Sequence, residues 1–137
     1  MPLLTNDEQL RRAMTETKTI AVIGLSPDSA KPSHFVPAYM QSKGYRIIPV
    51  NPTVDSVLGE KAYASLADVP EKVDMVDVFR RAEKTPPIVD EAAKIGAKLV
   101  WLQEGIASDE AAAKAEAHGL GIVMDKCLMK EHKRLFG

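Results

Sequence analysis

Short apolar runs recur along the chain, separated by polar segments that often end in glycine. They cover residues 19–24, 45–50, 73–79, 98–102 and 121–124. Continuous apolar runs of roughly four to eight residues are typical of strands that are buried on both faces, as in a parallel sheet. The pattern therefore predicts about five parallel strands.

The segments between these runs carry the signals of helix starts and ends. Residues 33–43 are predicted to be helical, Thr85 followed by two prolines opens another helix, and Ser108 followed by two acidic residues opens a third. Pro37 is tolerated mainly in a first helical turn, which favours a helix start later than Ser33. A glycine closes each helix where a strand is about to begin: Gly44, Gly96 and Gly119. This alternation predicts a Rossmann-like α/β fold, doubly wound in three α/β/α layers.

Two further helices are predicted at the ends of this pattern. Thr5 and Glu8 have capping-box spacing, so residues 1–16 are expected to hold an N-terminal helix outside the sheet. Residues 127–136 mix apolar and basic positions, as in an amphipathic helix, which we expect to pack on the first one. Because 137 residues suffice for one well-packed core and hardly for two, we expect a single domain over residues 1–137.

Composition and charge exclude several classes of function. A net charge of -1 lacks the basic excess of nucleic-acid-binding proteins, so local groups must hold any anionic ligand. No apolar run approaches the roughly 20 residues that cross a bilayer, and the first residues do not resemble a signal peptide. We therefore expect a cytoplasmic protein that binds neither membranes nor nucleic acid. The single cysteine, Cys127, excludes an internal disulfide.

The carboxyl ends of the predicted strands define a candidate ligand site. In a doubly wound sheet, ligands bind beyond those ends, where the strand order reverses. The first strand leads through Gly24 into a polar loop and a helix N-terminus, an arrangement that suits a phosphate group. Hydroxyl and ammonium groups in this loop add donors and positive charge: Ser26, Ser29, Lys31 and Ser33. The site is expected to comprise four segments: residues 24–33, 51–52, 79–81 and 103–105.

Several of these side chains also have structural explanations. Ser33 would serve equally well as a helix N-cap, and Lys31 as a solvated charge. One of Arg80 and Arg81 should face the crevice and pair with a phosphate or a ligand carbonyl, although a surface ion pair is as compatible with the sequence. Trp101 lies in a buried strand and is predicted to belong to the core.

Motifs for the common nucleotide and catalytic sites are incomplete. The loop after Gly24 lacks the other glycines of a dinucleotide fingerprint, and Asn51 stands near the place of the acidic residue that binds NAD ribose. The histidines have no metal-ligand spacing, and no catalytic constellation can be singled out, so we predict no metal and no catalytic residue. Cys127 is compatible with a buried apolar role and with a reactive thiol at a helix start.

Six segments together match a known family: GLSP (24–27), KPS (31–33), GYRIIPVNP (44–52), LGEKAY (58–63), VDMVDVFR (73–80) and GAKLVWLQ (96–103). They resemble the stand-alone CoA-binding domain proteins, which are single-domain relatives of the CoA-binding domain of the succinyl-CoA synthetase α subunit. The resemblance implies a Rossmann-like fold that binds CoA or an acyl-CoA. The synthetase's phosphorylated histidine belongs to a second domain that this sequence lacks, so ligase activity is not expected.

Carried over by position, the resemblance implies CoA contacts after the first, second and fourth strands, and a segment after the third strand that lines the pantetheine arm. These residues are Gly24, Leu25, Ser26, Ser33, Asn51, Pro52, Leu102, Gln103 and Gly105, with Val78, Phe79 and Arg80 along the arm. Two alternatives stay open: a nicotinamide-dinucleotide-binding enzyme or redox sensor, and a regulatory module that docks a partner through residues 127–136. The sequence also leaves open a homodimer and a mixed disulfide between Cys127 and CoA.

Overall fold

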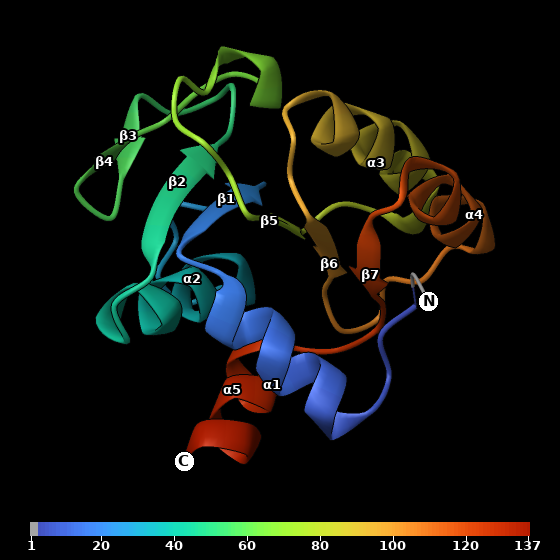
Figure 1. Ribbon diagram of the computed structural model, residues 1–137. Helices are drawn as coiled ribbons and strands as arrows, with labels where there is room; N and C mark the ends of the chain where they lie inside the picture. The colour runs from blue at the N-terminus through green and yellow to red at the C-terminus, as the bar shows by residue number, and fades with distance from the viewer. Residues whose placement is uncertain (1–2) are drawn as a thin grey trace.

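The computed structural model describes residues 3–137 and consists of a parallel sheet between two layers of helices (Figure 1). The five strands of the sheet are β1 (Thr19–Ile23), β2 (Arg46–Val50), β5 (Met75–Val78), β6 (Leu99–Leu102) and β7 (Gly121–Val123). All neighbouring pairs are parallel, in the order β2-β1-β5-β6-β7. The predicted doubly wound α/β fold is confirmed.

Helices cover both faces of this sheet (Figure 1). One face carries α1 (Asp7–Glu16), α2 (Pro32–Ser42) and α5 (Leu128–Phe136). The other carries α3 (Thr85–Lys94) and α4 (Asp109–His118). The connection from β2 to β5 contains the short antiparallel pair β3 (Ser56–Val57) and β4 (Glu60–Lys61), followed by the 3-10 turn η1 (Leu66–Asp68). A second 3-10 turn, η2 (Ala82–Lys84), runs directly into α3.

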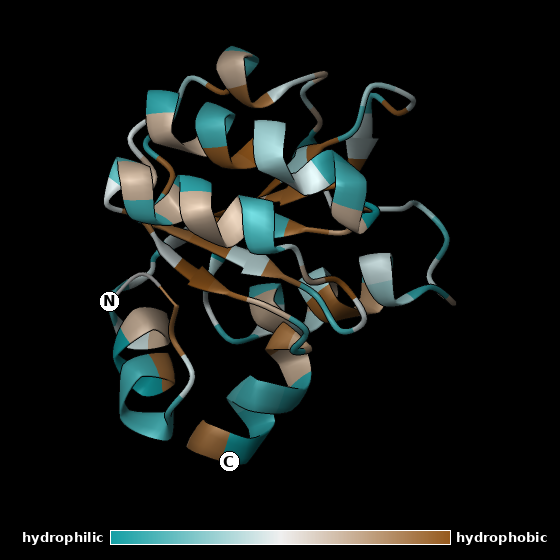
Figure 2. Ribbon diagram, turned by 90° about the vertical axis from the view of Figure 1, so that its right-hand side faces the viewer, coloured by the Kyte–Doolittle hydropathy of each residue, from teal (hydrophilic) through white to brown (hydrophobic). Residues whose placement is uncertain are grey.

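The two faces of the sheet have separate apolar cores, and Figure 2 shows the mostly brown strands between helices in which teal residues alternate with paler ones. Trp101 is fully buried on the α5 face, which confirms its predicted role in the core. Its indole Nε1 donates to Lys126 O at 2.8 Å, so the segment that leads into α5 is fixed to β6. None of the helices between residues 3 and 137 is long and apolar enough to span a bilayer.

The start of α1 differs from the prediction by one residue. The N-cap is Asn6, whose side chain accepts from Gln9 N at 2.8 Å, while Gln9 Oε1 accepts from Asn6 N at 3.3 Å. The expected capping box of Thr5 was wrong because asparagine and glutamine form this reciprocal pair, and Thr5 N itself donates to Gln9 Oε1. The predicted helix over residues 1–16 therefore begins at Asp7, and residues 1–2 lie outside the described part.

Pro37 lies in the interior of α2, which begins at Pro32, so the expected later helix start was wrong. Proline has no N–H, and inside a helix it leaves the carbonyl four residues earlier without its usual donor. Here that carbonyl belongs to Ser33, and it accepts from Ser26 N at 3.1 Å. The polar loop after β1 supplies the missing donor, which explains why the proline is compatible with this helix.

Candidate functional site

The loop after β1 lies where the strand order reverses, because β2 and β5 flank β1 on opposite sides. Gly24 ends β1 with φ +87°, a backbone conformation that favours glycine. A Cβ at this position would lie 2.8 Å from Phe79 O and 3.0 Å from Arg80 Nη1. Glycine is therefore required both for the turn and for the close approach of the β1 loop to the end of β5.

The N-terminus of α2 presents free polar groups beside this glycine. Its N-cap is Lys31, whose side chain makes no capping hydrogen bond, so the alternative of Ser33 as the N-cap was wrong. Within residues 3–137, Ser33 N donates to no acceptor, whereas the N–H groups of His34 and Phe35 donate to Lys31 O. The Ser33 amide and hydroxyl are thus available to an anion at the positive end of the helix.

Two pockets open at the carboxyl ends of the strands. The α5-side pocket has a volume of about 610 Å³ and extends from the N-terminus of α2, at Lys31 and Ser33, past Phe79 to Gln103 and Cys127. The α3-side pocket has a volume of about 420 Å³. It is lined by apolar side chains from the ends of β1 and β2, from η1 and from α3: Ile23, Val50, Pro52, Leu66, Pro87 and Ile88. Arg80 lines both pockets and therefore lies between them, at a position that we call the junction.

The charges around the two pockets are mostly positive. Lys31 and Arg81 line the α5-side pocket, Lys84 lines the α3-side pocket, and Arg80 lines both. In the described part of the chain, none of these four cations forms an ion pair within 4.0 Å. The acidic Glu104 at the rim pairs with a lysine of α5 at 2.9 Å. The site therefore offers unpaired positive charge to an anionic ligand.

Gln103, a predicted contact residue, links three elements beneath the α5-side pocket. Its Nε2 donates to Asp77 Oδ1 on β5, and its Oε1 accepts from Leu128 N at the start of α5 at 3.3 Å. Both ends of the amide are therefore bonded within the protein. Asp77 is fully buried, and its Oδ2 has no hydrogen-bond partner among the described residues. Burial raises the pKa of the Asp77 carboxyl to about 7, although the hydrogen bond from Gln103 acts in the opposite direction.

The other predicted residues lie around this site at different depths. Lys31, Ser33, Pro52, Phe79, Arg80 and Gln103 line a pocket. Three more are fully buried in the core and line neither pocket: Leu25, Val78 and Leu102. The remaining ones hold loops in place: Asn51 Nδ2 donates to Leu25 O at 2.9 Å, Gly105 N donates to Asp125 Oδ1 at 2.6 Å, and Ser26 bonds the start of α2.

A family model for the CoA binding domain matches residues 18–133. This chain belongs to the CoA-binding domain family. The chain is 39% identical over 124 residues to the uncharacterized protein YneT of Bacillus subtilis, which covers 90% of this chain and 92% of that protein. A solved structure of a hypothetical protein from Pyrococcus horikoshii OT3 has a TM-score of 0.93 and 41% identity, with 97% of this chain and 94% of that chain covered.

A longer relative contains a similar domain. Acetate–CoA ligase [ADP-forming] II of Archaeoglobus fulgidus is 34% identical over 101 residues, which are 72% of this chain and 15% of the ligase. The family resemblance predicted from the sequence motifs is confirmed, and the domain matches only a small part of this ligase.

Within this CoA-binding domain, the sequence did not single out the α3-side pocket. Lys84 and Ile88, from η2 and α3, line it together with Leu66 of η1. The predicted third segment ended at Arg81 and missed them. A usable signal was present, because Thr85 was expected to open a helix and the residues just before a helix start lie near the preceding strand end.

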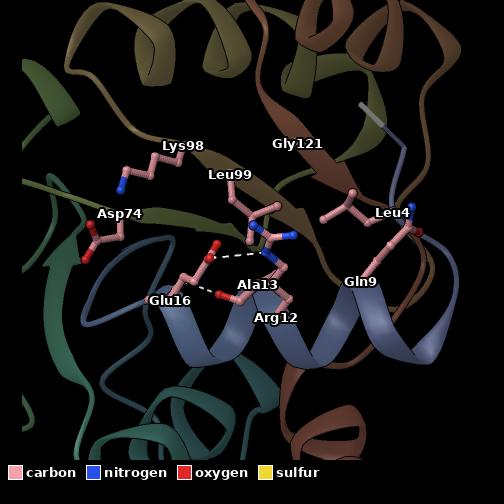
Figure 3. A pocket seen from close by; sticks show the side chains of 10 residues that line it. Leu4, Gln9, Arg12, Ala13, Glu16, Asp74, Lys98, Leu99 and Gly121 are labelled. Carbon is pink, nitrogen blue, oxygen red and sulfur yellow. Dashed lines mark hydrogen bonds and ion pairs between the residues drawn. The ribbon is translucent and has the colours of Figure 1, made fainter. Parts of the chain in front are cut away.

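A third hollow of about 270 Å³ lies at the opposite edge of the CoA-binding domain, between α1 and the amino ends of β5, β6 and β7 (Figure 3). Of its four charged side chains, all but Lys98 have partners among the described residues. Arg12 pairs with Glu16 at 3.2 Å, and Asp74 Oδ2 accepts from the backbone N–H groups of Lys18 and Thr19, both at 3.0 Å. Within residues 3–137, no group of three or more metal-ligating side chains occurs. These features leave the carboxyl-end pockets as the candidate site.

Proposed function

We propose that this protein binds CoA or an acyl-CoA across the two carboxyl-end pockets and does not turn it over. The observation that carries the proposal is the position of Arg80 between the two pockets, over Gly24, at the point where the strand order reverses. Membership of the CoA-binding domain family supports the choice of ligand.

The chemistry of the pockets suggests how the ligand is arranged. Arg80 and the free Ser33 amide flank the junction and suit the diphosphate. The α3-side pocket, with Pro52 and Ile88, suits the adenine ring. The α5-side pocket would then take the pantetheine arm, whose thiol end lies toward Cys127.

Two observations favour CoA binding over a nicotinamide-dependent reaction. The residue that follows β2 is Asn51, whose amide is bonded to Leu25 O and to Thr53 instead of presenting a carboxylate to a ribose. In addition, no histidine is among the described residues that line the two pockets, so neither pocket presents an imidazole base.

Thermal unfolding in the presence of CoA tests the proposal. A ligand that binds only the native state stabilises it by about 2.7 kcal/mol at a concentration of 100 times Kd. We expect a concentration-dependent rise in Tm with CoA and no rise with NADH. After prolonged incubation, chromatography should recover acetyl-CoA unchanged. The absence of a Tm shift and of heat in a CoA titration would overturn the binding proposal, and consumption of acetyl-CoA would overturn the claim that no turnover occurs.

A further inference from the structure

Lys84 is the one lysine among the residues that line the α3-side pocket. It ends η2 and is the N-cap of α3, where its side chain makes no capping hydrogen bond. In the part of the chain that the structure describes, it forms no ion pair within 4.0 Å. The other charged groups of this pocket are Arg80 at the junction and Glu91, farther along α3.

The N-terminus of α3 has few backbone donors to offer an anion. Pro86 and Pro87 occupy its first turn and carry no N–H. The N–H of Thr85 is already used, because it donates to Ala82 O. This end differs from that of α2, where the Ser33 N–H is free. An anion at α3 must therefore be bound by side chains, and Lys84 is the cation placed for it at the positive end of the helix.

The α3-side pocket has both apolar walls and charged side chains, and these suit different parts of the ligand. An adenine ring fits the apolar walls of the α3-side pocket, and the Glu91 carboxylate supplies an acceptor for its exocyclic amino group. With the diphosphate at Arg80, the ribose lies between Arg80 and the adenine ring. CoA carries a phosphate on the 3′-oxygen of that ribose, and the remaining unpaired cation of the pocket is Lys84.

We infer that Lys84 binds the 3′-phosphate of CoA and so makes the site selective for CoA over 3′-dephospho-CoA. The inference rests on the proposed function, including its placement of adenosine in the α3-side pocket, and adds to it a contact with the 3′-phosphate. The phosphate monoester is close to doubly charged at neutral pH, and its attraction to the exposed Lys84 weakens as salt screens it. The selectivity should therefore decrease as ionic strength rises.

Calorimetric titration of the full chain with CoA and with 3′-dephospho-CoA tests this assignment. Wild type should bind CoA about tenfold more tightly than dephospho-CoA. In Lys84→Met, dephospho-CoA should bind at most about twofold more weakly than CoA, mainly because the variant binds CoA less tightly. Lys31→Met is the matched control, since it makes the same change in the α5-side pocket. It should weaken the binding of both ligands alike and leave the ratio of their dissociation constants at about ten.

The outcomes separate the two proposals. If wild type binds neither ligand, the proposed function fails, and the role of Lys84 fails with it. If wild type binds CoA but Lys84→Met keeps the wild-type ratio, the assignment of Lys84 is overturned while CoA binding stands. A ratio that collapses in Lys31→Met instead would place the 3′-phosphate in the α5-side pocket and reverse the orientation. Thermal unfolding of each variant serves as the check on folding.

Discussion

Replacing the buried Asp77 by asparagine should remove a pH-dependent loss of stability from this protein. The carboxyl is fully buried in β5, accepts from Gln103 through Oδ1 and has no partner for Oδ2 among the described residues. Asparagine keeps the acceptor for Gln103 and has nearly the size of the protonated acid, but it cannot ionise. The variant therefore separates the charge of this residue from its shape.

The magnitude follows from the pKa of Asp77, which burial raises from 3.8 to about 7 in the folded state. The folded protein binds this proton more tightly than the unfolded chain, so stability is highest below the unfolded pKa and falls as the pH rises toward 7. The full range of about three pKa units corresponds to about 4 kcal/mol. Between pH 5 and pH 8, the wild-type protein should lose about 2.5 kcal/mol through this group.

Urea unfolding at pH 5 and pH 8, followed by the fluorescence of Trp101, measures the effect. The free energy of unfolding of Asp77→Asn relative to wild type should rise by about 2.5 kcal/mol between the two pH values. Carboxyls whose pKa is lowered by ion pairs, such as Asp7, Glu71 and Asp90, titrate in both proteins and cancel in the difference. A difference that stays constant with pH would refute the conclusion that Asp77 is protonated by burial.

Three other substitutions test the site, and a fourth serves as a control for the first. Gly24→Ala should lower the free energy of unfolding by about 3 kcal/mol, because the added Cβ would lie 2.8 Å from the backbone oxygen of Phe79. Gly59→Ala, also at positive φ but in open space, should lower it by about 1 kcal/mol. Equal losses in urea unfolding would contradict the steric argument. Gln103→Leu should lower the free energy of unfolding by about 2 to 3 kcal/mol and speed hydrogen exchange at the Leu128 amide. Unchanged exchange would show that the hydrogen bond from Leu128 N to Gln103 does not hold the start of α5 in place. Arg80→Met should weaken CoA binding about tenfold or more in calorimetric titration, with little change in the midpoint of urea unfolding. Undiminished affinity for CoA would show that Arg80 does not contact the ligand.

Much of the fold could be predicted because its signals are local. Five apolar runs became the five strands, and Gly44, Gly96 and Gly119 all have positive φ at helix ends, as expected. Two of the errors at helix starts have a common cause. Both depend on one particular hydrogen bond. The Asn6 side chain accepts from Gln9 N, and the Ser33 carbonyl left without a donor by Pro37 accepts from Ser26 N. Residue preferences indicate that a helix starts nearby but do not decide between neighbouring hydrogen-bonding schemes.

The site was predictable at the level of loops and less so at the level of side chains. The four segments follow from the topological rule, since parallel strands end at one edge of the sheet. Whether the Arg80 side chain would face the candidate site or a surface carboxylate depended on packing, and the structure places it over Gly24. The link from Asp77 through Gln103 to Leu128 joins residues far apart in sequence, and no local pattern indicates it. The α3-side pocket likewise arises only when η1 and α3 come together.

The proline inside α2 implies a compromise between stability and function. Replacing Pro37 would restore a backbone donor to the helix, and that donor would compete with Ser26 N for the Ser33 carbonyl. A search for more stable variants would favour such a replacement, since proline is a poor residue in a helix interior. The regained helical bond would release the loop beside the free Ser33 amide. Stabilising substitutions on this helix are therefore expected to trade against ligand affinity, in contrast to those on α1 at the other end of the sheet.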